Sequence, residues 1–173
     1  MLAGLLASTW WPNVGLAEGP PLRAAIMATY LVKFSPFVEW PPDAFASASA
    51  PLVICVVGDP LGRAIDEAAS GQTDNQHPVI VHHIAAARPD AACHILFTEG
   101  TPQQPVEQGL AAVKGKPVLT VSDQPAPAAI KGIINFVVED NHVRFEIDQA
   151  QAAQAGLRLS SQLLALATNV QRR

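Results

Sequence analysis

The run Leu52–Val57 constrains the fold of this 173-residue chain most, because every residue in it is apolar. An alternating strand covers one face of a sheet, whereas an uninterrupted apolar strand has to be covered on both faces. Further apolar runs that predict strands follow at 78–83, 94–98 and 117–121. Helical patterns lie at 61–69 and 106–113. This alternation predicts an α/β domain with a mixed, mostly parallel sheet and helices on both of its faces.

The C-terminal part of the predicted sheet is a β-hairpin. Two strand patterns, 132–138 and 143–147, flank a short polar turn, so their strands should be antiparallel. Asp148 and Ser160 are favourable N-cap residues and predict short helices after the hairpin. We therefore expect a single domain of about six strands over residues 22–170.

Residues 1–17 predict an export signal, or the remnant of one. They carry no charged side chain, and Gly15 and Ala17 fit the small-residue positions of a signal-peptidase site. Pro12 interrupts the stretch, which is shorter than the about 20 apolar residues of a membrane span. An export signal normally begins with a basic residue, but the first basic residue here is Arg23. The alternative is therefore an N-terminal arm buried against the domain.

Cys55 and Cys93 are the two cysteines of the chain. An even number of cysteines in an exported protein favours a disulfide. Their apolar surroundings also fit two free, buried thiols, so both alternatives stay open at this stage. A metal site is not expected, because cysteines this far apart lack the nearby ligands that zinc requires.

Three motifs could carry chemistry, and each has a structural alternative that fits better. Residues 58–62 are rich in glycine, but their spacing does not match a dinucleotide fingerprint. His82 and His83 are neighbours on a strand and point to opposite faces, so they are expected to be edge residues. Ser122 and Asp123 lack the elbow that exposes a serine nucleophile. We therefore expect no enzyme and no cofactor.

Five residues are candidates for binding another protein. Trp40 follows Glu39 and precedes two prolines, and tryptophan is enriched in interface hot spots. The alternative is that Trp40 covers one end of the core. Arg144 and Glu146 share one face of a strand, and with Arg158 they are the charges most interleaved with apolar residues. They could anchor a partner or form internal ion pairs.

Net charge argues against two classes of partner. The chain carries a net charge of −4 with no basic stripe, which argues against a nucleic-acid or anionic-membrane surface.

The chain resembles the YfiR family of periplasmic proteins over about Leu22 to Thr168. The resemblance is carried by several segments in the same order, at 22–25, 33–41, 54–59, 93–97, 117–123, 132–136 and 143–164. It implies a compact α/β protein, often a homodimer, that acts in the periplasm. It also implies a partner, the periplasmic domain of an inner-membrane diguanylate cyclase. The regulator would hold this cyclase inactive and thereby lower the level of cyclic-di-GMP.

By the same resemblance, Cys55 and Cys93 would form a structural or redox bond whose loss releases the cyclase. Related domains also occur beside other membrane sensors, such as histidine kinases. A small-ligand sensor is therefore the alternative function. Its site would be the polar and acidic rim where the predicted strands end, at Gly58-Asp59, Thr98-Glu99 and Ser122-Asp123.

Overall fold

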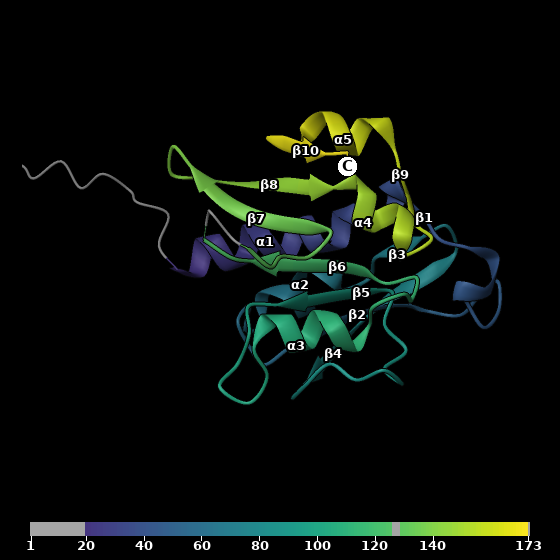
Figure 1. Ribbon diagram of the computed structural model, residues 1–173. Helices are drawn as coiled ribbons and strands as arrows, with labels where there is room; N and C mark the ends of the chain where they lie inside the picture. The colour runs from purple at the N-terminus through teal and green to yellow at the C-terminus, as the bar shows by residue number, and fades with distance from the viewer. Residues whose placement is uncertain (1–19, 126–128, 173) are drawn as a thin grey trace, which may run out of the picture.

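The computed structural model describes residues 20–125 and 129–172 (Figure 1). The predicted leader, 1–17, lies outside the described residues. The α-helices are α1 (Pro20–Phe34), α2 (Ala64–Ala69), α3 (Val106–Ala112), α4 (Gln149–Gln154) and α5 (Ser161–Leu166), and two 3-10 turns are η1 (Ser35–Phe37) and η2 (Pro42–Ala44). The strands are β1 (Val38–Glu39), β2 (Leu52–Val57), β3 (Thr73–Asp74), β4 (His77–Ile84), β5 (Ile95–Thr98), β6 (Leu119–Asp123), β7 (Ile134–Glu139), β8 (His142–Asp148), β9 (Arg158–Leu159) and β10 (Asn169–Gln171).

The described strands form an eight-stranded sheet in the order β10-β8-β7-β6-β5-β2-β4-β3. The neighbours from β4 to β7 are parallel, whereas β7 and β8 are antiparallel. The prediction of a single α/β domain with a mixed, mostly parallel sheet is confirmed. The strand number is higher than the about six expected, because β3 and β10 are edge strands too short to show an apolar pattern. A separate antiparallel pair joins β1 and β9.

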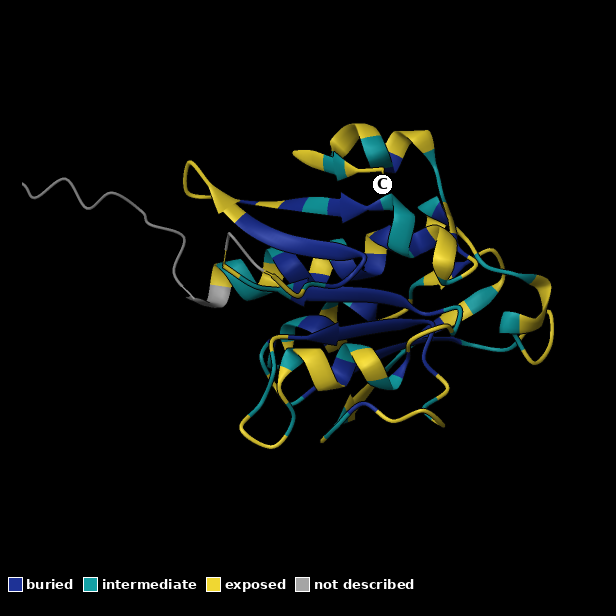
Figure 2. Ribbon diagram, in the orientation of Figure 1, coloured by how far each residue is buried: buried dark blue, intermediate teal, exposed yellow. Residues whose placement is uncertain are grey.

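Strand β2 is buried on both faces, as its uninterrupted apolar run predicted. Leu52, Ile54 and Val56 belong to the core that α1 and α2 cover. The residues between them pack on the opposite face, with Ala112 and Val113 at the end of α3. Figure 1 shows α3 in front of the sheet and α1 behind it, and Figure 2 shows the central strands buried between them.

Helix α1 is fastened to the sheet by an aromatic cluster. The Phe34 and Phe145 ring centroids lie 5.2 Å apart, and those of Tyr30 and Phe145 lie 5.5 Å apart. The Phe34 ring also stacks on Phe136 at 6.0 Å. Such pairs add about 0.5–1.5 kcal/mol each to the burial of their area. The end of α1 is therefore rigidly placed, which positions the residues that follow it.

The turns and caps after β6 follow the predicted chemistry. Asp140 and Asn141 join β7 to β8 with φ values of 48° and 62°, the left-handed pair of a tight hairpin turn. The Asp148 carboxylate accepts a hydrogen bond from the Gln151 amide at 2.8 Å and so caps α4. The Ser160 hydroxyl caps α5 in the same way. Among the described helices, none is long and apolar enough to cross a bilayer.

Candidate functional site

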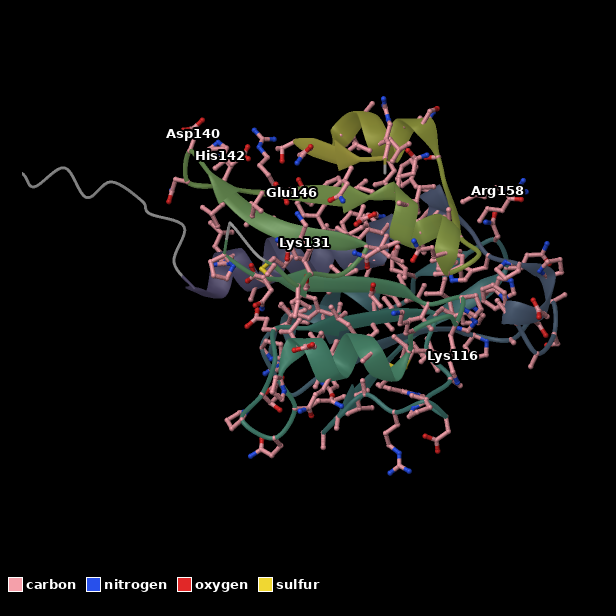
Figure 3. The ribbon with its side chains drawn as sticks, in the orientation of Figure 1. Lys116, Lys131, Asp140, His142, Glu146 and Arg158 are labelled. Carbon is pink, nitrogen blue, oxygen red and sulfur yellow. A yellow bond between two sulfur atoms is a disulfide. The ribbon has the colours of Figure 1, made fainter. Side chains whose placement is uncertain are left out.

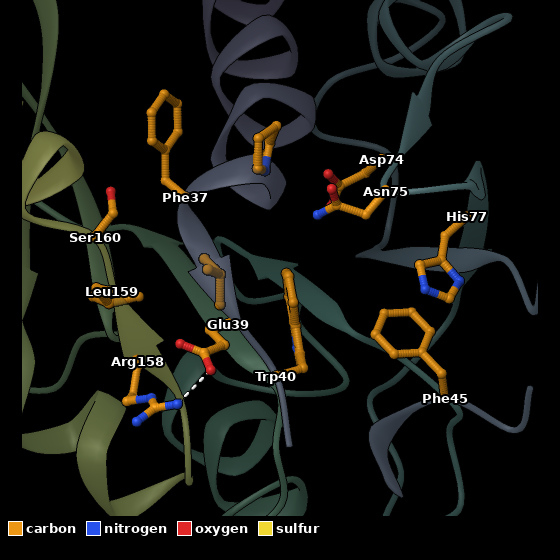
Figure 4. A pocket seen from close by; sticks show the side chains of 12 residues that line it. Phe37, Glu39, Trp40, Phe45, Asp74, Asn75, His77, Arg158, Leu159 and Ser160 are labelled. Carbon is orange, nitrogen blue, oxygen red and sulfur yellow. Dashed lines mark hydrogen bonds and ion pairs between the residues drawn. The ribbon is translucent and has the colours of Figure 1, made fainter. Parts of the chain in front are cut away.

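A groove of about 430 Å³ lies where the end of α1 meets the C-terminal part of the chain (Figure 4). One wall is formed by η1, β1 and β9, and the other by Phe45 and the turn between β3 and β4. We call it the Trp40 groove. Its walls include Phe37, Trp40, Phe45, His77, Arg158 and Leu159.

The β1–β9 pair brings Glu39 and Arg158 to this groove. These residues are opposite one another in the antiparallel register, and their side chains form an ion pair although 119 positions separate them. Arg158 is 78% exposed and Glu39 is 64% exposed, so water screens the pair and it adds little stability. The pair is therefore a surface feature and not part of the core.

Trp40 lies between the core and the groove. Its indole is half-buried against the core and also lines the groove. The ring meets Phe45 edge-on, with centroids 6.1 Å apart and planes at 76°. Its Nε1 atom is buried and has no hydrogen-bond partner among the described residues. A buried N–H without an acceptor costs about 1–3 kcal/mol.

Phe45 lies between two histidine rings. Its centroid is 3.9 Å from that of His77 and 4.2 Å from that of His94, with planes tilted by only 16° and 18°. Sequence reasoning missed this stack, although Phe45 is the one large side chain in the loop 44–50. In the part of the chain that the structure describes, no group of three or more acids, cysteines and histidines is placed to hold a metal ion.

Asp74 completes the groove on the β3 side. It is 7% exposed, and burial raises the pKa of its carboxyl above the ordinary value. The Ser35 hydroxyl and His77 oppose this rise in the pKa, by hydrogen bonding and by charge. The groove thus combines aromatic side chains, the titratable groups Asp74 and His77, and the exposed Glu39–Arg158 ion pair.

Cys55 and Cys93 form a disulfide on the face of the sheet that α3 covers. Their Cα atoms lie 5.7 Å apart, and the bond closes a loop with a sequence separation of 38. Cys55 is 2% exposed and Cys93 is 6% exposed. Of the two alternatives that the sequence left open, the bridge is the one present, and it is shielded from solvent.

The sequence model of the YfiR/HmsC-like family matches residues 24–168, which is most of the chain and includes both walls of the groove. The chain belongs to the YfiR/HmsC-like family. This confirms the resemblance, and it fits a regulatory role in the periplasm. The comparison with curated proteins gave no match.

Two of the candidate residues in this YfiR/HmsC-like chain lie away from the Trp40 groove. Glu146, on β8, is bound to Lys131 with an Nζ–carboxylate distance of 2.6 Å, and both are largely buried. Arg144 lies exposed on the same strand. Figure 3 shows Glu146 and Lys131 close together and Arg158 distant from them. Of the two roles that the sequence left open for Glu146, the structure shows the internal ion pair, and its partner, Lys131, was not indicated by the sequence.

Ser122 has a structural role in the YfiR/HmsC-like fold. It is 0% exposed, its hydroxyl donates to Asn135 Oδ1 at 2.7 Å, and it accepts from the Gly132 amide at 2.8 Å. This network joins Ser122 on β6 to Gly132 and to Asn135 on β7. A substrate cannot reach a serine that is buried and bonded in this way.

The predicted acidic rim is occupied by the chain itself. Asp123 forms an ion pair with Arg23 from α1. Burial raises the pKa of Glu99 to about 7, and the neighbouring Asp123 carboxylate adds to the rise while Arg23 opposes it. Glu99 is an exposed residue overall. Water on its open side therefore screens the repulsion between the two carboxyl groups.

The remaining motifs have the predicted structural roles. Gly58 and Gly62 adopt φ values of +73° and +53° in the turn after β2. Helix α2 begins at Ala64, a few residues later than expected. His82 and His83 lie exposed on β4. The His83 ring contacts the Asp66 carboxylate at 3.1 Å, which is a surface interaction.

Proposed function

We propose that this YfiR/HmsC-like chain is a non-enzymatic periplasmic regulator. Its partner is the periplasmic domain of an inner-membrane diguanylate cyclase. By holding this cyclase inactive, the regulator lowers the level of cyclic-di-GMP. The Trp40 groove is the surface that binds this partner. Family membership supports the regulatory role, and the groove geometry supports the surface.

The observation that carries the choice of surface is the Trp40 indole. Its ring lines the groove, and its N–H, which is buried behind that surface, lacks an acceptor among the described residues. Tryptophan and arginine dominate interface hot spots, and here Trp40 and Arg158 line one groove with the exposed Glu39 carboxylate between them. A partner segment with an apolar side chain and a carbonyl or carboxylate acceptor has the matching chemistry.

The mechanism is a population shift. A regulator that binds the inactive cyclase more tightly than the active one moves the equilibrium toward inactivity. To take the cyclase from about 1% to about 99% inactive, the two affinities have to differ by about 10⁴-fold. Any change that lowers the binding-competent fraction of the regulator raises its apparent Kd for the cyclase in inverse proportion to that fraction.

Two substitutions at Trp40 test the groove. Trp40→Ala removes the whole anchor, and we expect binding to weaken by about 30-fold, which corresponds to about 2 kcal/mol for a hot-spot residue. Trp40→Phe keeps an aromatic ring but deletes the N–H, so its effect should be intermediate. Arg144→Ala, on the distant strand β8, is the matched control. Cyclic-di-GMP in cells and capture of the purified cyclase domain are the measurements.

We expect deletion of the gene to raise cyclic-di-GMP, and a catalytically dead cyclase to abolish that rise. Trp40→Ala should behave like the deletion while the protein still accumulates and gives an unchanged circular dichroism spectrum. Unchanged cyclic-di-GMP in the deletion strain would refute regulation of a cyclase. Derepression by Arg144→Ala but not by Trp40→Ala would instead place the contact on β8, beside Glu146.

The alternative, a small-ligand sensor coupled to a histidine kinase, has weaker support. Arg23 already pairs with Asp123, and Ser122 is buried, so the rim offers few free acceptors. The homodimer stays a prediction, which sedimentation of the purified chain tests.

A further inference from the structure

Two histidines hold the loop that forms one wall of the Trp40 groove. His94 Nε2 lies 3.1 Å from the Ala44 carbonyl oxygen, and His77 Nδ1 lies 2.5 Å from that of Ala50. Between these two attachments the Phe45 ring is clamped by both imidazoles. We call this arrangement the Phe45 latch. It sets the position of the Phe45 ring that the Trp40 indole meets edge-on.

The hydrogen bonds of the latch require a neutral His94. The Val53 backbone N–H donates to His94 Nδ1 at 3.1 Å, so this nitrogen has to be unprotonated. The Ala44 carbonyl can only accept, so the single ring proton is on Nε2. A second proton would point at the Val53 N–H and leave that buried donor without an acceptor. His94 is 8% exposed, and burial lowers its pKa, although the Ala44 carbonyl acts in the opposite direction.

The charges around the stack also disfavour a protonated latch. His77 faces His94 across the Phe45 ring, and its charge lowers the pKa of His94 further. The Asp74 carboxyl interacts with His77, and its own pKa is raised by burial. On the opposite wall of the groove, Glu39 and Arg158 neutralise each other. No carboxylate among these groups is placed to stabilise a His94 cation.

We propose that the Phe45 latch is an acid-released switch: protonation of His94 frees the loop that carries Phe45 and dismantles one wall of the Trp40 groove. The switch is a property of the isolated chain. Its consequence, a weaker hold on the partner in acid, rests on the function proposed above. Acidification would then be a signal to which this surface responds.

The direction of the effect follows from proton linkage. Above the ordinary histidine pKa of 6.5, neither the closed nor the open latch binds a proton at His94, so the latch keeps its full stability. As the pH falls below 6.5, the open form takes up a proton before the closed form does. The ratio of open to closed latch therefore rises by up to tenfold per pH unit until the lowered pKa of His94 is reached.

Trp40 provides the probe. The chain has tryptophans at 10, 11 and 40, so a full-length chain with Trp10→Phe and Trp11→Phe reports on Trp40 alone. We expect acrylamide quenching of its fluorescence to rise severalfold between pH 7.5 and 5, with a midpoint below 6.5 and an unchanged far-ultraviolet spectrum. His94→Gln, added to this chain, should abolish the transition. His142→Gln, at an exposed histidine on β8, should leave it intact (Figure 3).

Nitrogen-15 spectra of the His94 ring keep the test decisive if His94→Gln folds poorly. At pH 7.5 they should show a proton on Nε2 alone, and the second proton should bind at the midpoint of the Trp40 transition. A constant quenching rate down to pH 5, or a transition that survives His94→Gln, would overturn the switch. If the switch fails while Trp40→Ala still derepresses the cyclase at neutral pH, only this inference falls.

Discussion

Removal of the Cys55–Cys93 bond should cost this protein much of its stability. The bond closes a loop with a sequence separation of 38, which corresponds to about 4 kcal/mol of lost unfolded-state entropy at 25 °C. Domains of this size are stable by about 5–15 kcal/mol in total, so the bond accounts for a large share. With a urea dependence of about 2 kcal/mol per molar, the unfolding midpoint should fall by about 2 M.

Burial of the two sulfur atoms makes a second, kinetic prediction. Cys55 and Cys93 are almost fully buried, so a reductant has to wait for the fold to open before it reaches the bond. We expect reduction by dithiothreitol to be slow in buffer and to accelerate with urea in step with opening of the fold. If the bond is regulatory, stress that loosens the fold should therefore precede reduction.

The assay is urea unfolding, followed by circular dichroism, of the oxidised chain, the reduced chain and the double variant Cys55→Ala, Cys93→Ala. The double variant should match the reduced chain within about 1 kcal/mol and should not respond to reductant. Equal midpoints for the oxidised and reduced chains would refute the entropic estimate. Rapid reduction without denaturant would contradict the shielding of the bond.

Gly132→Ala should lower the free energy of unfolding by about 3 kcal/mol, because its new Cβ would meet the Thr120 carbonyl oxygen at 2.7 Å and backbone cannot move aside as a side chain does. Gly109→Ala is the matched control, because the nearest atom to its new Cβ is the Gln104 Oε1 atom at 3.4 Å, an ordinary van der Waals contact; it should be neutral or up to about 1 kcal/mol stabilising in urea titrations. The pKa of Glu99 is raised from 4.5 to about 7, so its contribution to stability is present below pH 4.5 and is lost as the pH rises through 7. Glu99→Gln should therefore make the chain more stable than wild type at pH 8, with no gain at pH 4; a gain that is equal at both pH values would contradict the raised pKa beside Asp123.

The elements of this fold were predictable wherever the signal is local. The apolar run of β2 predicted a strand covered on both faces, and its alternate residues do enter two separate cores. Asp148 and Ser160 predicted the starts of α4 and α5, since an N-cap side chain bonds only two or three residues ahead. The edge strands β3 and β10 carry no such pattern, because sheet neighbours alone stabilise segments that short.

The candidate site could be predicted only in part. Glu39 and Trp40 stood out by residue type and by the prolines after them. The contact of Glu39 with Arg158, and the stacking of Phe45 between two histidines, depend on chain segments far away in the sequence. The same holds for Lys131, the partner of Glu146 that the strand pattern did not indicate.

The sequence by itself determined which segments are buried, where the hairpin turns, and that no common catalytic motif is present. Only the tertiary structure decided that β1 pairs with β9 and that two histidines clamp Phe45 beside Trp40. The physical reason is range. Propensity, periodicity and capping act over a few residues, whereas a groove forms from side chains that the order and crossovers of the sheet bring together.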